Sequence, residues 1–131
     1  MNVRRDPRVL LLDIDRAAEK IAGYIEGMDF ATYATSAGVQ DQLERNFITI
    51  GEALNRLSLV SPELSERIPN AKDIIGFRHK LVHGYDHIDA EIVWSAAVDD
   101  LPALRKTVRS VLAGLDRAAD NQPSPQTGDR R

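Results

Sequence analysis

The stretch LERNFITIGEALNRL, residues 43–57, decides the fold class of this chain. Its large apolar residues recur at alternating steps of four and three: Leu43, Phe47, Ile50, Leu54 and Leu57. That spacing gathers them on one face of an α-helix, whereas a strand would need an apolar residue at every second position. We therefore expect a long packed helix here. Gly51 on that helix would let a neighbouring helix approach closely, because it has no side chain.

Helical patterns also precede this stretch. Asp6 followed by Pro7 is typical of a helix start, since Asp caps the first turn and Pro is tolerated at the first position. The apolar residues that follow recur at steps of three and four: Leu10, Ile14, Ala17, Ile21, Ile25 and Met28. Asp29 or Thr32 can begin the next element, and we expect a bend within it at Gly38.

After residue 57, a Ser–Pro pair at 61–62 predicts a short helix that ends before residue 70. Asn70 is expected to cap a third main helix, with Asp73 three residues later reaching back to complete a capping box. This helix should run to about His83. Gly84 suits the left-handed conformation just past its end.

The last long helix is expected to start at Asp89, and its apolar residues keep a helical period: Val93, Ala97, Leu101, Leu104, Val108, Val111 and Leu115. Pro102 should kink this helix without ending it, because the apolar stripe continues in phase on both sides. No segment alternates with a period of two. The chain thus predicts an all-α, up-and-down bundle of four to five helices over residues 1–118, followed by a polar, disordered tail at 119–131.

Composition narrows the possible functions. A chain of 131 residues fits one domain, and the absence of cysteine excludes disulfides, thiolate metal sites and cysteine nucleophiles. We find neither a signal-peptide pattern nor an apolar run that could span a bilayer, so we expect a cytoplasmic protein without a membrane partner. The net charge of −3 argues against a protein that coats nucleic acid. A nuclease, however, needs only a local basic groove.

Two basic clusters could supply such a groove. Arg105, Lys106 and Arg109 form the later one, and the simpler interpretation of that cluster is a solvated helix face. The earlier cluster is the segment RHKLVHGY at residues 78–85. Within it, Arg78 offers a planar charged fork for phosphate oxygens and His83 can exchange a proton near neutral pH. Tyr85 adds a hydroxyl and a face on which a base can stack.

Arg78 is out of place on its helix, because it falls in the middle of the arc between Ile74 and Leu81. A charge on an apolar face needs an anionic partner or a wet cleft. A structural ion pair with Glu52 or Asp99 would explain it without catalysis. His83 lies five residues later, about 140° away around an unbroken helix. Either the helix unwinds near Gly84, or a second copy of the chain completes the site.

The same segment also carries residues with metal-ligand spacing. His79 and His83 are four residues apart, and Asp86 and His87 follow closely. No HExxH motif is present, and a polar cluster at a helix end explains the pattern equally well. We therefore expect neither a metal ion nor a cofactor.

The order R-x4-H-x-Y resembles the signature of the HEPN superfamily, in particular the HepT-type toxins (DUF86-like) of bacterial toxin–antitoxin pairs. Further matches occur in the same order over roughly residues 8 to 115: Gly51-Glu52-Ala53, Ile75-Gly76-Phe77, Ile88-Asp89, Val93-Trp94 and Leu101-Pro102. One position departs from the pattern. His79 stands where this family more often has Asn or Asp.

The resemblance implies a metal-independent endoribonuclease toxin that acts on RNA as a homodimer with a shared cleft. Arg78 and His83 would be catalytic, with His79, Lys80 and Tyr85 as substrate-binding or helper residues. A cognate nucleotidyltransferase antitoxin would neutralise the toxin by transferring AMP to Tyr85. Two alternatives stay open. One is a non-catalytic helical module that binds a nucleotide or a nucleotidyltransferase, and the other is a dimerisation bundle with an ion-paired arginine.

Overall fold

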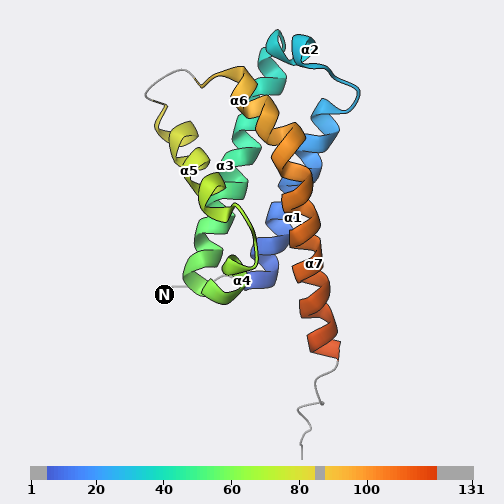
Figure 1. Ribbon diagram of the computed structural model, residues 1–131, viewed down its shortest axis with the longest axis vertical. Coiled ribbons are helices and arrows are strands. Elements are labelled where there is room, and N and C mark those ends of the chain that lie inside the picture. Colours follow the sequence, from blue (N-terminus) through green and yellow to red (C-terminus); the bar gives the residue numbers. More distant parts are fainter. Residues whose placement is uncertain (1–5, 85–87, 121–131) are drawn as a thin grey trace, which may run out of the picture.

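The computed structural model describes residues 6–84 and 88–120, and every regular element within them is helical (Figure 1). The elements in chain order are α1 (Pro7–Ile25), α2 (Phe30–Ala34), α3 (Ala37–Val60), α4 (Pro62–Glu66), α5 (Ala71–His83), α6 (Ala90–Ser95), the π-helical turn η1 (Ala96–Asp100) and α7 (Leu101–Asp120). The predicted all-α class is confirmed. No helix of the described residues is long and apolar enough to cross a membrane.

The long helices alternate in direction, as expected for an up-and-down bundle. In Figure 1, α1 and α5 run upward and α3 and α7 run downward. Helix α3 packs on both α1 and α5, and α7 packs on the other side of α1. Because α5 has only α3 as an extensive neighbour among the described elements, most of its surface stays open.

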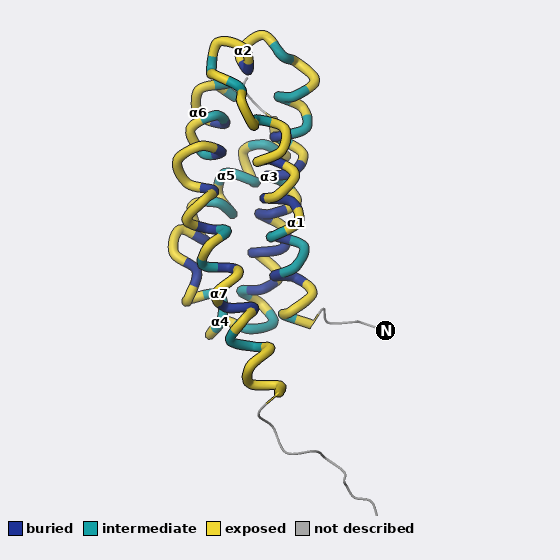
Figure 2. The backbone as a smooth tube through the Cα atoms, turned by 90° about the vertical axis from the view of Figure 1, so that its right-hand side faces the viewer, coloured by how far each residue is buried: buried dark blue, intermediate teal, exposed yellow. Residues whose placement is uncertain are grey.

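The core consists of the faces that the apolar periodicity predicted. The five residues of the apolar repeat in the stretch 43–57 are at most 2% exposed: Leu43, Phe47, Ile50, Leu54 and Leu57. Figure 2 shows such buried positions along the inner sides of the helices, with exposed positions outward. Tyr33 of α2 joins this core, with its ring 5.2 Å from that of Trp94 between centroids.

Most predicted helix starts are confirmed by capping hydrogen bonds. The carboxylate of Asp6 accepts from the Arg8 backbone N–H at 2.9 Å, and that of Asp29 accepts from the Thr32 N–H at 2.8 Å. At the last long helix, Asp89 accepts from the Glu91 N–H at 2.9 Å. Each carboxylate therefore satisfies a backbone donor that has no partner within its own helix.

Two local predictions are wrong. The bend expected at Gly38 lies earlier, because α2 ends at Ala34 and Gly38 already belongs to α3. In the connection, the hydroxyl of Ser36 donates to the Thr32 carbonyl at 2.7 Å. Asn70 precedes α5 but makes no side-chain capping bond. Its backbone is left-handed, with φ of 66°, so the capping box expected with Asp73 does not form. Short polar side chains such as Asn tolerate that conformation.

The last helix continues past Pro102, as its apolar stripe predicted. The turn before the proline is the π-helical η1, and such wide turns relieve the clash between a proline ring and the carbonyl four residues earlier. Helix α7 extends to Asp120, two residues beyond the expected end of the domain at 118. Residues 121–131 of the predicted tail lie outside the described residues.

Candidate active site

Arg78 lies where α5 comes closest to α3. A Cβ atom added at Gly51 would collide with the Cβ of Arg78 and would lie 2.7 Å from its Cγ and 3.3 Å from the Ile74 carbonyl oxygen. Only glycine leaves room for this approach. The close contact predicted at Gly51 is thus confirmed, and it places the base of the Arg78 side chain directly against the α3 backbone.

The Arg78 guanidinium is only loosely held. Its Nη2 atom donates to Glu52 Oε2 at 3.4 Å, near the upper limit for a hydrogen bond. The Arg78 side chain is 27% exposed and that of Glu52 is 54% exposed. The Nε atom is buried and has no hydrogen-bond partner within the described residues. An anionic ligand can therefore reach the guanidinium only at its exposed atoms and not at Nε.

Of the two carboxylates that could have neutralised Arg78, the structure selects Glu52. The alternative, Asp99, accepts instead from the Ser95 hydroxyl at 2.9 Å. The structure therefore contains an ion pair between Arg78 and Glu52, one of the two that the sequence allowed. Because Glu52 is more than half exposed, water and ions screen the attraction, and an incoming phosphate can compete for the guanidinium.

His83 does not meet Arg78 within one chain. Helix α5 is continuous from Ala71 through His83, and the Gly84 N–H caps it by donating to the Lys80 carbonyl at 3.0 Å. Gly84 takes the predicted left-handed conformation, with φ of 53°. The helix thus does not unwind before His83, and its geometry leaves the two side chains about 140° apart.

The histidine that α5 brings to His83 is His79. Their ring centroids lie 4.1 Å apart, with the planes tilted by 56°. Lys80 is exposed on the same helix. Tyr85, together with Asp86 and His87, lies outside the described residues. Among the residues that are described, no group of three or more His, Asp or Glu side chains is placed to hold a metal ion.

A cleft of about 350 Å³ separates α5 from α6 and η1. Phe77 lines it from α5, and its ring packs edge-on against Phe47 with a centroid distance of 5.4 Å. Ile92 lines the opposite side of the cleft and is exposed. Val82, one turn past Arg78 on α5, is also exposed. Glu91, Ser95 and Asp100 also line the cleft, so the surface beside the Arg78–His83 segment combines exposed apolar residues with acidic ones.

The family model described as "Ribonuclease HepT-like" matches residues 14–111. This chain belongs to that family. The relatives include "Putative RNase MJ0125" of Methanocaldococcus jannaschii, 25% identical over 86% of this chain and 97% of that protein. Another is "Putative RNase TTE0752" of Caldanaerobacter subterraneus subsp. tengcongensis, 28% identical over 82% of this chain and 96% of that protein. "Probable ribonuclease HepT" of Thermococcus cleftensis is 26% identical over 79% and 93%, respectively.

No solved structure matches the chain. The family and the names of the relatives confirm the predicted resemblance and the predicted enzyme class, a ribonuclease. They cover the segment that carries Arg78 and His83, since the match extends from residue 14 to residue 111.

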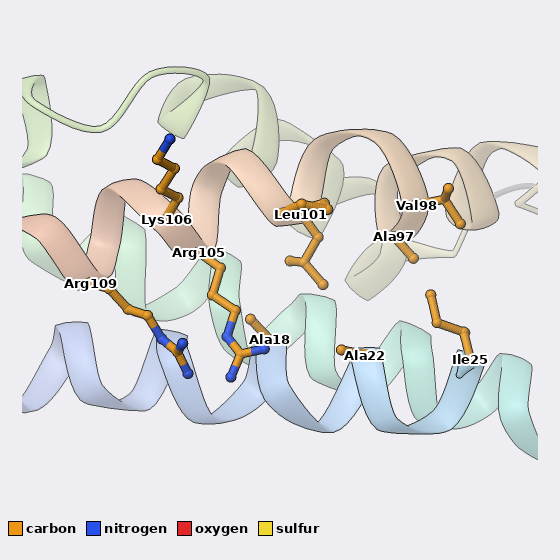
Figure 3. A pocket seen from close by; sticks show the side chains of 10 residues that line it. Ala18, Ala22, Ile25, Ala97, Val98, Leu101, Arg105, Lys106 and Arg109 are labelled. Atoms are coloured by element: carbon orange, nitrogen blue, oxygen red, sulfur yellow. The ribbon is translucent and has the colours of Figure 1, made fainter. Parts of the chain in front are cut away.

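The second basic cluster of this HepT-like domain is only in part the solvated helix face of its simpler interpretation, because Lys106 and Arg109 are exposed but both arginines also pair with α1. Figure 3 shows Arg105 and Arg109 reaching from α7 toward α1 across a trough of about 570 Å³, while Lys106 points the other way. The Nε atoms of both arginines donate to Asp15 Oδ1, at 3.2 and 2.9 Å. Two of the three cations are therefore engaged in joining helices. This pairing could not be predicted from the sequence, because Asp15 lies 90 residues earlier than Arg105.

Proposed function

We propose that this HepT-like ribonuclease is a metal-independent endoribonuclease toxin in which Arg78 and His83 act on one phosphodiester. The observation that carries the proposal is the loose contact of Arg78, whose partly exposed side chain donates from Nη2 to Glu52 only at 3.4 Å. A phosphate oxygen can replace the Glu52 carboxylate as the acceptor of that bond. The fork of a guanidinium then neutralises the charge that grows on the phosphate during reaction.

The chemistry is transfer of the phosphodiester to the neighbouring ribose hydroxyl. The 2′-oxygen attacks phosphorus and forms a new P–O bond, while the bond to the 5′-oxygen of the next nucleotide breaks. His83 accepts the proton of the 2′-hydroxyl and, as the imidazolium, gives a proton to the leaving 5′-oxygen. His83 fills the proton-transfer role. His79, whose ring lies beside it, and Lys80 assist in the groove.

A second copy of the chain completes the site in this proposal. Because α5 is an unbroken helix, Arg78 and His83 of one copy face different directions. A symmetric homodimer can place the Arg78 of each copy opposite the His83 of the other. The exposed apolar residues Val82 and Ile92 border this segment and would be covered by such a partner.

Single substitutions test the catalytic pair. Arg78→Ala and His83→Ala should each lower RNA cleavage 10²- to 10⁴-fold and relieve growth arrest on expression, since each removes a charge-stabilising or proton-transfer group. Arg67→Ala removes an exposed arginine outside α5 and should cleave like wild type. EDTA should leave the rate unchanged. Loss of cleavage on chelation would replace this mechanism by a metal-dependent one.

An ion pair alone is the competing explanation for Arg78, and the contact with Glu52 favours it. Glu52→Gln separates the two ideas. If Arg78 serves only that pair, the variant changes stability by no more than about 1 kcal/mol and has no effect on RNA, because half-exposed pairs contribute little. If Arg78 binds phosphate, freeing it from a competing carboxylate should strengthen the binding of RNA.

The partner in this proposal is a cognate nucleotidyltransferase that transfers AMP to Tyr85. Tyr85 directly follows Gly84, the exposed cap of α5, so a modifying enzyme would approach next to His83. An added phosphate brings negative charge to the groove and repels RNA. Incubation with the partner and ATP should add AMP to the Tyr85 peptide and abolish cleavage, whereas Tyr85→Phe should resist modification. AMP found only on other residues would contradict this mechanism of neutralisation.

A further inference from the structure

A second groove, away from Arg78, runs between α1 and α3. Its volume is about 490 Å³, and its walls are polar and charged. Arg16, Lys20 and Tyr24 line it from α1, at successive turns of one helix face, while Arg45 and Thr49 line it from α3. The two helices lie side by side along this groove (Figure 1).

The groove concentrates positive charge on a chain whose net charge is −3. Three cations, Arg16, Lys20 and Arg45, face one lining carboxylate, Asp13. Between the residues that the structure describes, no salt bridge engages any of these three cations. Arg105 and Arg109 at the trough between α1 and α7 are, by contrast, both paired with Asp15. Unpaired cations gathered across two helices raise the local positive potential and attract an anionic ligand.

An aromatic ring stands at one end of this groove. Tyr24 is 40% exposed, and its hydroxyl donates to Gln42 Oε1 at 3.2 Å, which ties the ring to α3. Exposed aromatic rings beside a cationic track are the combination by which proteins hold single-stranded nucleic acid, with phosphates on the cations and a base stacked on the ring.

We propose that the α1–α3 groove binds the backbone of single-stranded RNA, as an extension of the substrate site of the proposed ribonuclease, on whose function this inference rests. Arg16, Lys20 and Arg45 would contact phosphates, and Tyr24 would stack on a base. The groove and the catalytic segment share helix α3 as a neighbour. Thr49 lines the groove, and Glu52, the partner of Arg78, follows one turn later on α3.

The test measures binding of a labelled 12-nucleotide RNA carrying 2′-O-methyl groups, which cannot be cleaved, over a range of NaCl concentrations. For single strands, the slope of log affinity against log salt is about −0.7 for each phosphate contacted. Replacing Arg16, Lys20 and Arg45 together by Gln should therefore make the slope about two units shallower. The matched control replaces Arg67, Lys72 and Arg117 by Gln, which alters the net charge equally at exposed positions outside the groove.

Tyr24 provides an independent arm of the same test. Tyr24→Leu should weaken RNA binding about fivefold or more, and Tyr24→Phe should retain it, because stacking needs the ring and not the hydroxyl. The inference is overturned if the groove and control triple variants bind RNA alike, or if wild-type protein does not bind. Competition by a mononucleotide at equal strength would also overturn it in favour of a nucleotide pocket. Salt-dependent binding without cleavage of ordinary RNA would instead refute the proposed catalysis and leave the groove assigned.

Discussion

Gly51 is the residue on which the placement of Arg78 depends, because a methyl group there would overlap the Arg78 side chain. Gly51→Ala should force α5 away from α3, lower the free energy of unfolding by about 1–3 kcal/mol, and reduce RNA cleavage. Gly76→Ala is the matched control, since nothing lies within 4 Å of the added Cβ. That variant should be stabilised by up to about 1 kcal/mol, as alanine favours helix. Urea unfolding of both variants measures the contrast, and equal stabilities would contradict the close approach.

Tyr33 has a fully buried side chain whose hydroxyl lacks a hydrogen-bond partner within the described residues. Tyr33→Phe keeps the ring against Trp94 and removes the unsatisfied group. We expect the free energy of unfolding to rise by about 1 kcal/mol at neutral pH. Fluorescence of Trp94, the single tryptophan, can follow the unfolding. A less stable Phe variant would show that the hydroxyl is satisfied in solution.

The same residue predicts a pH dependence. Burial, with the negative charge of Glu44, raises the pKa of Tyr33 from 10.0 to about 12. The pKa of Tyr33 is higher in the folded state than in the unfolded state. The stability that comes from burying its neutral side chain is therefore fully present below pH 10 and is lost as the pH rises toward 12. Wild type should thus lose on the order of 2 kcal/mol more than Tyr33→Phe across this range. Parallel losses in the two proteins would contradict the raised pKa.

Residues whose signal is local could be predicted from the sequence, whereas residues defined by distant contacts could not. Gly51 could be predicted because a glycine within an apolar helix permits close packing, and Arg78 because a charge interrupted an apolar arc. The choice of Glu52 over Asp99 as its partner required the structure. The cap predicted at Asn70 is wrong, because Asn is a common capping residue but its left-handed backbone does not fit a cap here.

Between helices, Asp15 joins α1 to α7 by accepting hydrogen bonds from both Arg105 and Arg109. Its side chain is only 19% exposed, so removing it leaves a partly buried guanidinium without its main partner. Asp15→Ala should lower the free energy of unfolding by about 1–2 kcal/mol. Asp116→Ala breaks the half-exposed pair with Arg8 between the same two helices and should change stability little. Thermal melts at low and high salt compare the two, and an equal loss would contradict the role of burial.

The elements themselves were largely predictable, for physical reasons that act over short distances. Capping carboxylates and apolar periods are local, so the starts of α1, α2 and α6 followed from Asp6, Asp29 and Asp89. The π-helical turn before Pro102 was foreseen only as a kink, because the sequence does not say how a helix accommodates a proline. The bend expected at Gly38 lies earlier, in the connection between α2 and α3 where the hydroxyl of Ser36 donates to the Thr32 carbonyl.

For the whole molecule, the site is harder to predict than the fold because its parts come from separate helices. The α1–α3 groove draws Lys20 and Arg45 from positions 25 residues apart, and neither belongs to a basic run in the sequence. The Arg78–His83 segment was recognisable as a motif. Its geometry on α5, however, shows that a motif on one helix need not converge within one chain.

That geometry makes the homodimer the decisive prediction for the molecule. We expect light scattering at micromolar concentration to give twice the mass of the chain, since the apolar side chains of Val82 and Ile92 are exposed in one copy. A strictly monomeric protein would remove the composite site.

Mixing two inactive variants tests whether the site is shared. Arg78→Ala and His83→Ala are each inactive as homodimers in the proposal. In a mixed dimer, the intact Arg78 of the His83 variant faces the intact His83 of the Arg78 variant, so one of two sites is restored. After free subunit exchange, the mixture should recover about a quarter of the wild-type rate, because half of the dimers are mixed. If mixed dimers form, as shown by co-purification of differently tagged chains, yet remain inactive, then each chain carries its own complete site and α5 must rearrange to bring Arg78 and His83 together.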